Sequence, residues 1–366
     1  MIKKNLIFFM SDFSSGGAGN SISKLCLNLP SNEYKISVIS LGKCAYSKIF
    51  KKNKINVIEL KNKKLIFSIN DLQNLIKKSV KKNYKNILIS NIHYNNIILT
   101  LITKKIDDLK IILVERTPLE ELKIYFSITD FIKKKIISSL VKMTYPLSDG
   151  IIANSKGIKD GFDINIKPKI RVIHPPAITK IIKPKKSVKN LKNFKAVCFS
   201  RLSIEKNLEC AISSFNYLKN EKISLTIYGD GYLREKLTSL TNSLNLKDKI
   251  FFKKHTNNVQ REIKKFDILI SPSYFEGCSN SILEALNNDL IVIASDCPGG
   301  NYEILSGGKS GMLFLTNDKY DLSLKIKKII KNFNHYKYKY RKYRFKLKNY
   351  LLSKNIKEYS KMFKKI

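Results

Sequence analysis

Glu276 and Glu284 are the residues whose spacing points most directly to chemistry. They stand in the segment 273–284, SYFEGCSNSILE, with seven residues between them. A buried strand over 268–271 precedes them, so we expect a loop to carry Glu276 and a helix beginning near Asn280 to carry Glu284 in its second turn. Because a helix rises about 1.5 Å per residue, the second carboxylate then lies further along the same face. Two carboxylates placed in this way can grip two sets of hydroxyls, such as a sugar ring and a ribose.

The residues between these acids add polar groups at the same place. Gly277, Cys278 and Ser279 lead from the loop into the helix, so their backbone amides lie at the mouth of the predicted strand. An isolated pair of acids is ordinarily solvent-facing charge. The Gly-Cys-Ser-Asn run at a helix start is unusual for plain surface, and it favours a binding site that includes Glu276, Asn280 and Glu284.

A pair of basic residues follows the first predicted strand of the second half. Arg201 and Lys206 stand five positions apart in SRLSIEKN, residues 200–207. Arg supplies a planar fork and Lys a mobile point charge, so the two can converge on one diphosphate. Two ordinary solvated cations are the alternative. The location at a strand end favours a ligand, because open α/β sheets bind ligands there.

Two glycine-containing turns complete the motifs. The run SSGGAGN over 14–20 places Gly16 and Gly17 between the first strand and a helix, where backbone amides and the helix N-terminus attract anions. A turn that needs glycine for its geometry alone is the alternative, since G-x-G-x-x-G spacing is absent. The segment 295–305, SDCPGGNYEIL, combines a tight turn with a helix cap at Asn301. A simple turn and a functional segment fit it equally well.

The elements that must position these residues are short apolar runs separated by helical patterns. The runs do not alternate polar with apolar residues, which predicts parallel strands covered by helices on both faces. Expected strands are 6–10, 36–41, 57–60, 87–89, 111–114, 150–153 and 171–173, then 196–200, 225–228, 250–252, 268–271, 291–294 and 312–315. Expected helices include 71–80, 131–143, 207–219, 233–243, 258–266, 281–286 and 302–305.

The restart of this alternation predicts two doubly wound α/β domains facing a central cleft. The segment 174–193 holds three prolines, many lysines and no clean period, which is typical of a linker. We expect an N-terminal domain over 1–175, a linker over 176–193 and a C-terminal domain over 194–345. A basic helix over 346–366 follows, and it could pack back on the N-terminal domain.

Composition narrows the class of protein without deciding it. Lys and Arg number 69 against 29 Asp and Glu, a formal net charge of +40. Such an excess favours polyanionic partners, but codon bias toward Lys, Asn and Ile is an equal explanation. The six cysteines form no C-x-x-C pair, which is consistent with free thiols in a reducing cytosol. The apolar run 6–10 is too short for a signal peptide, and no run is long enough to span a membrane.

Two basic segments carry apolar or aromatic residues of their own. Residues 126–143 combine apolar positions at helical spacing with Lys133, Lys134 and Lys135. A helix that contacts anionic lipid and a helix that faces the core with a solvated back fit equally well. The segment 335–350, HYKYKYRKYRFKLKNY, fits a solvated helix face, a membrane-surface helix or a nucleic-acid arm.

Together these residues resemble the family 4 glycosyltransferases, which have the GT-B fold. The resemblance covers nearly the whole chain and is strongest over 200–315. It implies that Gly16 and Gly17 meet the phosphates of a nucleotide-sugar donor and that Arg201 and Lys206 hold its diphosphate. It also implies the following donor contacts: Glu276 with the transferred sugar, Glu284 with the ribose, Gly277, Cys278, Ser279 and Asn280 near the sugar and phosphates, Gly229 in the Gly-x-Gly turn, and Asn258 and Val259 near the nucleobase.

The same resemblance implies retention of the anomeric configuration without a divalent metal or cofactor, and no D-x-D stands at a strand end. A subgroup that builds surface polysaccharides and lipid-linked glycans is indicated by ERTP over 115–118 and CPGG over 297–300. The chain departs from the family after Glu-Gly, where Cys278 and Ser279 stand. The family's usual histidine after the fifth strand is also replaced. His93 after the fourth strand is the substitute catalytic candidate, and a packed or solvated histidine is the alternative.

The expected partners follow from this resemblance. They are a nucleotide sugar, most simply a UDP-sugar, and a saccharide or lipid-linked acceptor, with peripheral contact to anionic membrane at the cytoplasmic face and no nucleic acid. A nucleotide-sugar epimerase of the same fold is the alternative enzyme. A basic nucleic-acid-binding protein is the alternative from another class, although no reading module is recognisable.

Overall fold

The chain folds into two α/β units, one of which is built from two separate stretches of sequence. The computed structural model describes residues 3–11, 13, 16–60, 65–184, 192–256 and 258–366. The first unit comprises Met1–Pro176 with Leu352–Ile366, and the second comprises Ala177–Leu351. The expected linker over 176–193 includes residues 185–191, which lie outside the described residues. Ala177 and Ile178 at its start are already buried in the core of the second unit.

The first unit contains, within its described residues, a seven-stranded sheet in the order β3-β2-β1-β4-β5-β6-β7. Every neighbouring pair is parallel. Its strands are β1 Lys4–Met10, β2 Tyr34–Leu41, β3 Asn56–Leu60, β4 Lys85–Asn91, β5 Leu109–Glu115, β6 Gly150–Ala153 and β7 Ile170–Val172. Its helices are α1 Gly17–Asn28, α2 Ser47–Lys52, α3 Ile69–Ser79, α4 His93–Thr103, α5 Ile128–Thr144, α6 Lys156–Asp160 and α14 Leu352–Lys365, with the 3-10 turns η1 Leu65–Ser68, η2 Leu119–Lys123, η3 Tyr145–Leu147 and η4 Lys167–Lys169.

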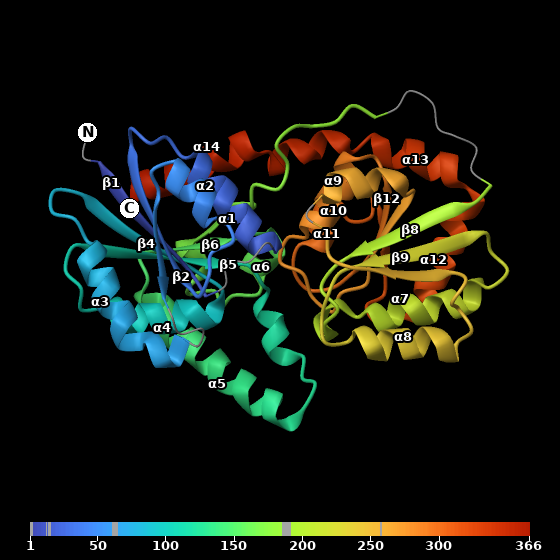
Figure 1. Cartoon of the computed structure of the whole chain (residues 1–366), viewed down its shortest axis with the longest axis horizontal. Helices are drawn as coiled ribbons and strands as arrows, with labels where there is room; N and C mark the ends of the chain where they lie inside the picture. The colour runs from blue at the N-terminus through green and yellow to red at the C-terminus, as the bar shows by residue number, and fades with distance from the viewer. Residues whose placement is uncertain (1–2, 12, 14–15, 61–64, 185–191, 257) are drawn as a thin grey trace. The chain divides into compact units, whose positions relative to one another are not determined.

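Strand β1 shows why its sequence is apolar from Leu6 to Met10. Leu6 and Phe8 pack into a core that contains residues of α1, α2 and α14, whereas Ile7 and Phe9 pack into a second core on the opposite face of the sheet. Successive side chains of a strand point to opposite faces, so a strand covered on both sides needs apolar residues at every position. Figure 1 shows α1, α2 and α14 on one face of the sheet and α3, α4 and α5 on the other.

Helix α14 completes the core of the first unit from the far end of the chain. Tyr359, Met362 and Phe363 are buried beside Phe8 and Tyr34. The Nζ of Lys4 also donates to the carbonyl of Phe363. The helix begins at Leu352, whereas we expected the C-terminal helix to begin at residue 346. The residues before Leu352 belong to the second unit, since Leu347 and Tyr350 are buried in its core.

The second unit repeats the architecture with a six-stranded sheet across its described residues, in the order β10-β9-β8-β11-β12-β13. Its neighbouring strands are also parallel. The strands are β8 Phe194–Phe199, β9 Ile223–Tyr228, β10 Ile250–Lys253, β11 Ile268–Ser271, β12 Ile291–Ser295 and β13 Met312–Phe314. The helices are α7 Leu208–Ser214, α8 Arg234–Ser243, α9 Val259–Glu262, α10 Asn280–Asn287, α11 Asn301–Ile304, α12 Lys319–Lys331 and α13 Phe333–Arg341, with η5 Ile204–Lys206, η6 Phe215–Leu218, η7 Ile263–Lys265 and η8 Arg344–Tyr350.

The strand predictions are confirmed in both units, since every expected run overlaps an observed parallel strand. The helices agree less well. The expected helix 207–219 is α7 followed by the 3-10 turn η6, and 258–266 is α9 followed by η7. In the described residues α2, α4 and α6 are helices that the sequence patterns did not predict.

The Lys- and Tyr-rich segment 335–350 has an exposed face, with Tyr338, Lys339 and Lys342 in solvent, as the solvated-helix interpretation expected, and also a buried face that was not expected. Tyr336, Tyr340 and Tyr350 are buried in the second unit, because α13 and η8 pack against the sheet and its helices. The pattern was ambiguous from sequence alone because tyrosine combines a large apolar ring with a polar tip and fits either a core or a surface.

Candidate active site

The strand order of each sheet predicts where a ligand would bind. In an open parallel sheet, ligands bind beyond the carboxyl ends of the strands where the strand order reverses. In the second unit this point lies between β8 and β11. The loops that follow these strands are 200–207 and 272–279, and they carry the basic pair and the first acid of the predicted donor site.

Lys206 and Glu276 meet at this point. Lys206 Nζ lies 2.7 Å from Glu276 Oε1, and the hydroxyl of Ser273 donates to the same oxygen at 2.8 Å. The side chains of Lys206 and Glu276 are only 18% and 14% exposed. A cation and an anion held together in a largely water-excluded place interact more strongly than a surface pair. The structure therefore brings together two of the residues that the sequence assigned to one site.

Arg201 does not share this contact. Its guanidinium Nη2 lies 3.0 Å from Glu205 Oε1, and its side chain is 78% exposed. Ser203 donates to the same Glu205 oxygen at 2.6 Å. The two cations thus have different carboxylate partners within one loop, and their convergence on a diphosphate stays a prediction.

The backbone of Glu276 is held on both sides by the turn over 298–300. Its amide donates to the carbonyl of Pro298 at 3.1 Å, and the amide of Gly300 donates to the Glu276 carbonyl at 2.8 Å. Gly299 has φ +112°, a left-handed conformation that favours glycine. The sequence left this turn without a definite role, and in the structure it fixes the loop that carries Glu276.

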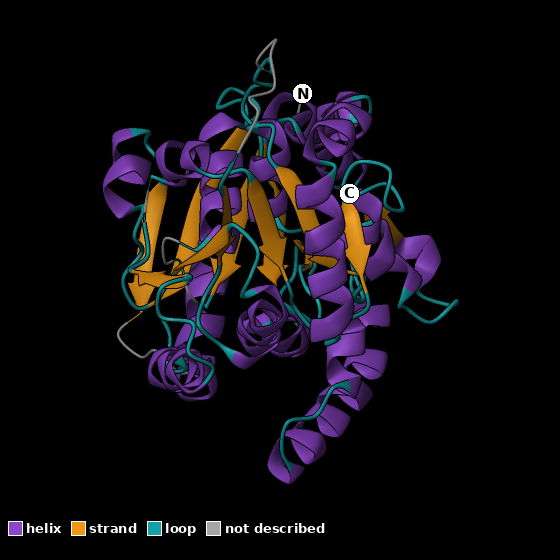
Figure 2. Ribbon diagram, turned by 90° about the vertical axis from the view of Figure 1, so that its right-hand side faces the viewer, coloured by secondary structure: helices purple, strands orange, loops and turns teal. Residues whose placement is uncertain are grey.

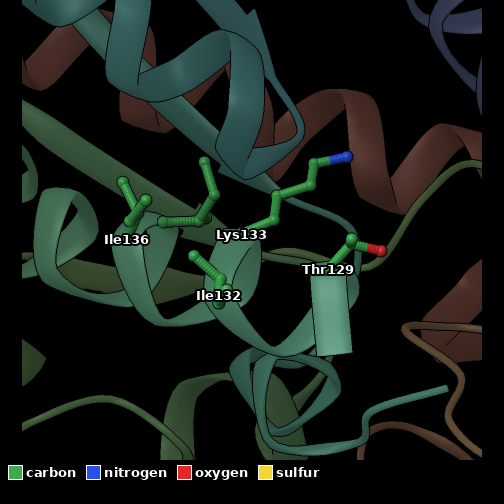
Figure 3. A pocket seen from close by; sticks show the side chains of 5 residues that line it. Thr129, Ile132, Lys133 and Ile136 are labelled. Carbon is green, nitrogen blue, oxygen red and sulfur yellow. The ribbon is translucent and has the colours of Figure 1, made fainter. Parts of the chain in front are cut away.

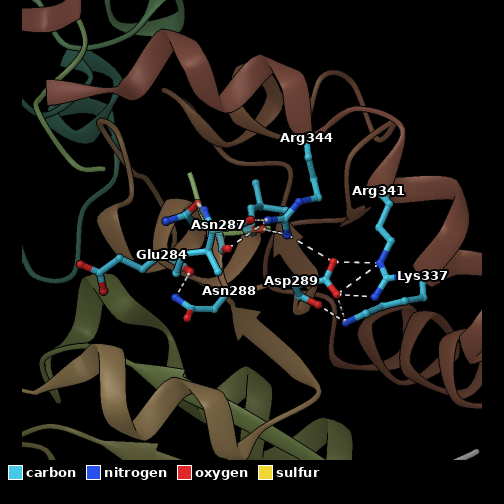
Figure 4. Close-up of polar contacts among 9 residues, drawn as sticks. Glu284, Asn287, Asn288, Asp289, Lys337, Arg341 and Arg344 are labelled. Atoms are coloured by element: carbon cyan, nitrogen blue, oxygen red, sulfur yellow. Dashed lines mark hydrogen bonds and ion pairs between the residues drawn. The ribbon is translucent and has the colours of Figure 1, made fainter. Parts of the chain in front are cut away.

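Glu284 lies on α10, which begins at Asn280 after the same loop. Figure 4 shows its carboxylate extending away from a cluster of charged residues at the other end of the helix. In that cluster Asp289 accepts from Arg341 at 2.6 Å, and Lys337 and Arg344 lie 3.4 and 3.2 Å from it. Arg344 also donates to the carbonyl oxygens of Leu286 and Asn287, which satisfies acceptors at the carboxyl end of α10. The basic segment 335–350 therefore holds the helix that carries Glu284.

Cys278 and Ser279 lie just before α10. Ser279 is buried and Cys278 is half-buried. The hydroxyls of Ser279 and Ser281 lie 3.1 Å apart. Gly277, also buried, completes the loop, so this stretch surrounds the start of the helix as the sequence predicted.

Gly229 is required by close packing between two loops of the site. It has φ +152°, and a Cβ at this position would lie 1.9 Å from the carbonyl oxygen of Ser200. The Leu202 amide donates to the Asp230 carbonyl at 3.0 Å. The turn after β9 therefore supports the loop that carries Arg201 and Lys206.

Asn258 and Val259, which the sequence predicts near the nucleobase of the donor, lie at the start of α9. The side chain of Asn258 caps this helix by accepting from the Arg261 amide at 3.2 Å, and Val259 is half-buried. Residue 257 lies outside the described residues. A contact of Asn258 and Val259 with a nucleobase stays a prediction.

Residues that sequence reasoning missed also lie at this edge. Tyr274 Oη and Asn207 Nδ2 both donate to Asn317 Oδ1 at 3.2 Å. Asn207 adopts φ +46° where η5 gives way to α7, a conformation that asparagine tolerates better than most residues. Ser273, the partner of Glu276, was likewise not singled out, since an isolated serine or asparagine carries no signal in a single sequence.

In the first unit, the glycine-rich turn and His93 flank the corresponding point of strand reversal, between β1 and β4. Gly16 and Gly17 are exposed at the start of α1, and residues 14 and 15 of the same motif lie outside the described residues. His93 is the first residue of α4 and has no exposed surface. A side chain enclosed in this way does not reach a substrate, so the catalytic role expected from the sequence has no support in this geometry.

In the described ranges, no group of three or more His, Cys, Asp or Glu side chains is arranged to hold a metal ion. All six cysteines are free, and Cys278 is the one with appreciable exposure. Across the described residues, no helix is long and apolar enough to cross a bilayer.

Comparison with known structures identifies the fold class as GT-B. HepE of Anabaena, solved in complex with UDP, superposes with a TM-score of 0.75 over 99% of this chain and 100% of its own, at 15% identity. Sucrose-phosphate synthase of Thermosynechococcus elongatus superposes with a TM-score of 0.82 over 99% of both chains, at 14% identity. The predicted class of two Rossmann-like domains is confirmed.

Sequence comparisons give a family match over part of the chain. Residues 179–346 match the model for glycosyl transferases group 1. An N-acetylgalactosamine-N,N'-diacetylbacillosaminyl-diphospho-undecaprenol 4-alpha-N-acetylgalactosaminyltransferase of Campylobacter jejuni is 30% identical over 178 residues, which are 48% of each chain. The chain thus spans about half the length of that curated relative, and 18% of the poly(glycerol-phosphate) alpha-glucosyltransferase of Bacillus subtilis at 34% identity. Together these findings show the GT-B fold and a match to the group 1 glycosyl transferases over residues 179–346.

Proposed function

We propose that this protein transfers a sugar from a nucleotide-sugar donor, most simply a UDP-sugar, to a saccharide or lipid-linked glycan acceptor. The observation that carries the proposal is the Lys206–Glu276 contact of 2.7 Å at the strand-reversal point of the second unit. A cation and a carboxylate in contact at the edge where sheets of this kind bind nucleotides support this proposal. The family match over 179–346 covers the same residues.

The proposed mechanism is electrostatic. When the bond between sugar and diphosphate breaks, negative charge develops on the diphosphate and positive charge on the sugar. Lys206 would stabilise the leaving diphosphate, with Arg201 joining it after leaving Glu205, and Glu276 would hold sugar hydroxyls. Glu284 would bind the ribose. Because this scheme uses side-chain cations for the leaving group, we propose that transfer needs no divalent metal. We propose retention of the anomeric configuration from the resemblance to the family 4 glycosyltransferases alone.

A donor panel tests the proposal. The protein is incubated with UDP-, GDP- and ADP-linked sugars, and donor hydrolysis, thermal stabilisation and release of free nucleotide diphosphate are measured with and without EDTA. We expect one UDP-sugar to stabilise the protein and to release UDP, with EDTA having no effect. Inhibition by EDTA that manganese reverses would contradict the metal-free scheme. Interconversion of the donor sugar without release of nucleotide would point instead to an epimerase.

We further propose that the acceptor side contacts anionic membrane at its cytoplasmic face through α5. This helix carries the exposed apolar residues Ile128, Ile132, Ile136 and Met143, of which Ile128 is 80% exposed. Figures 1 and 2 show the beginning of α5 projecting from the sheet of its unit. Figure 3 shows Ile132 and Ile136 beside Lys133 and Thr129 at a surface pocket on this helix.

Charge supports an anionic bilayer as the partner of this face. Lys133, Lys135 and Lys142 are exposed on α5, whereas its one acidic residue, Asp130, is paired with Lys134 at 2.9 Å. Exposed apolar residues bordered by lysines are typical of helices that lie in the lipid interface. Each lysine near an anionic surface adds about 1 kcal/mol of attraction. A lipid-linked acceptor would then be presented from the same surface.

A further inference from the structure

The first unit encloses a charged cluster at the start of α4. His93 Nε2 lies 2.8 Å from Glu121 Oε1, and His93 Nδ1 lies 3.5 Å from Glu115 Oε2. The side chains of His93 and Glu115 have no exposed surface, and that of Glu121 is 11% exposed. Ionisable groups are rarely enclosed to this extent unless they are paired.

Glu115 is held from two further elements. Asn96 Nδ2, one turn along α4, donates to Glu115 Oε1 at 2.6 Å, and the Tyr145 hydroxyl donates to the same oxygen. His93 opens α4, Glu115 ends β5, Glu121 lies in η2 and Tyr145 lies in η3. The imidazole therefore ties the start of α4 to the end of β5 and to the segment that follows it.

The surroundings favour the protonated imidazole. Burial alone would lower the pKa of His93, but contacts with Glu115 and Glu121 outweigh it and raise the pKa to about 9. Burial raises the pKa of Tyr94 to about 12 and raises the pKa of Tyr145 well above its ordinary value, so both tyrosines stay neutral where His93 titrates. With a proton on each ring nitrogen at neutral pH, His93 has no lone pair with which to act as a general base.

The segment that His93 holds leads directly into α5. Residues 116–127 run from the end of β5 to Ser127, whose hydroxyl caps α5 by accepting from the Asp130 amide at 3.1 Å. Lys134 Nζ donates back to the carbonyl of Ile124 at 2.6 Å. The contact with His93 therefore holds Glu121 in place within residues 116–127, the connection that sets where α5 begins.

The residue before His93 is itself in an unusual conformation. Ile92 has φ +74°, a left-handed value that is rare for a β-branched residue. Its amide donates to the Val114 carbonyl at 3.0 Å. Such conformations persist where surrounding contacts impose them and are concentrated at functional sites, so the position of His93 is set by its partners and not by local preference.

We infer that His93 is a positioning residue and not a catalytic acid or base. Its contacts with Glu115 and Glu121 fix the connection 116–127 and hence the acceptor side of the site. The acceptor part of this inference rests on the proposed function. The positioning part does not, because it concerns contacts within the first unit alone. The inference replaces the catalytic role that the sequence suggested for His93.

The first test needs no activity. The chain has four histidines, so imidazole resonances in an NMR titration of the full chain can be assigned with His93→Gln, and His335→Gln serves as an exposed control. We expect one histidine to titrate near 9 and to disappear in His93→Gln, and the same resonance to titrate lower in Glu121→Gln. A His93 that titrates at or below its ordinary value near 6.5 would overturn the inference.

The second test measures whether His93 and Glu121 hold the connection 116–127 in place. Amide hydrogen exchange of residues 116–127 should be faster in His93→Gln and Glu121→Gln than in the wild type, and unchanged in His335→Gln. Glu121→Gln keeps the size of the side chain and serves if His93→Gln fails to fold. Unchanged exchange of this segment in both folded variants would contradict a positioning role.

The third test separates positioning from catalysis by kinetics. Both variants should raise the acceptor KM roughly tenfold, as expected for a misplaced binding element, while kcat and donor affinity change less than twofold. A large loss of kcat with an unchanged acceptor KM would make His93 catalytic and overturn the inference. If no nucleotide sugar supports transfer at all, the proposed function fails, and the titration and exchange results still decide the role of His93.

Discussion

Lys206 and Glu276 stand 70 positions apart in the sequence, yet their side chains meet at 2.7 Å. Each comes from a loop after one of two adjacent parallel strands, β8 and β11. Their contact marks the strand-reversal point of the second sheet, where we propose that the donor binds. The ion pair keeps both side chains in place, so the proposed binding of a diphosphate would need little reorganisation there.

Replacing Lys206 or Glu276 should abolish transfer without unfolding the protein. Lys206→Ala removes the cation for the leaving diphosphate, and Glu276→Ala removes the hydroxyl ligand, so we expect kcat to fall by about 10²–10³ in each. Turnover with the best donor and far-ultraviolet circular dichroism check this. Lys236→Ala is the matched control, since Lys236 pairs with Glu209 on an exposed surface. Near-wild-type turnover in either site variant would count against the assignment.

Gly229→Ala should destabilise the second unit. The added methyl group would meet the Ser200 carbonyl at 1.9 Å, in a conformation with φ +152°. Backbone strain alone costs about 1–3 kcal/mol, and the clash adds to it. Gly308→Ala is the control, because φ is also positive there but the nearest atom lies at 3.9 Å. The free energy of unfolding in urea should fall clearly further for Gly229→Ala, and equal losses would show that the close packing does not matter.

Asp289→Ala should destabilise the same unit by removing the anion shared by Lys337, Arg341 and Arg344, whose side chains are 10–14% exposed. Breaking a largely buried charge cluster in this way costs about 3 kcal/mol. Glu209→Ala, which breaks an exposed pair, should cost less than about 1 kcal/mol. Chemical denaturation measures both. A loss no greater than that of the control would mean that the cluster contributes little to holding α10.

The His93 cluster predicts a loss of stability at alkaline pH. The folded-state pKa is raised from 6.5 to about 9. The stabilisation is therefore fully present below pH 6.5 and is lost as the pH rises through 9. The shift corresponds to about 3 kcal/mol. Unfolding free energies of the wild type and His93→Gln, measured between pH 6 and 10, should converge toward alkaline pH, and a difference that stays constant would contradict this linkage.

Membrane contact through α5 predicts that Ile132→Asp with Ile136→Asp weakens binding to vesicles of anionic lipid. Two exposed isoleucines that enter the lipid interface contribute enough apolar burial for a change of roughly tenfold or more. Sedimentation with anionic and with neutral vesicles measures it. Leu324→Asp, at an exposed apolar position of α12, should leave binding unchanged. Equal binding of the α5 variant and the wild type would exclude α5 as the contact.

The fold was predictable because its signal is local. Strands buried on both faces read as apolar runs, and β1 with Leu6 to Phe9 is an example in which every side chain has a core to enter. Helix α4 was missed because its sequence continues the apolar stretch of β4 through Ile92 without a glycine or proline. The break there comes from the left-handed conformation of Ile92, which its tertiary surroundings impose.

The candidate site was predictable in part. The spacing of Glu276 and Glu284 and the strand-end position of Lys206 pointed to one edge of the sheet. The pairing of Arg201 with Glu205 was not predictable, because exposed side chains choose among several neighbours of similar energy. The contact between His93 and Glu121 was also not predictable, because the two residues come together only when the chain after β5 folds back over the start of α4.

The return of α14 to the first unit has a consequence for synthesis of the protein on the ribosome. Phe8 and Tyr34 are made early, but Tyr359, Met362 and Phe363, which cover them, are added only after the whole of the second unit. One apolar face of the first sheet therefore stays exposed until α14 has been translated. The second unit, which lies between the two stretches, can complete its own core sooner. A chain truncated after residue 351 would leave this apolar face of the first sheet permanently exposed and would be prone to self-association.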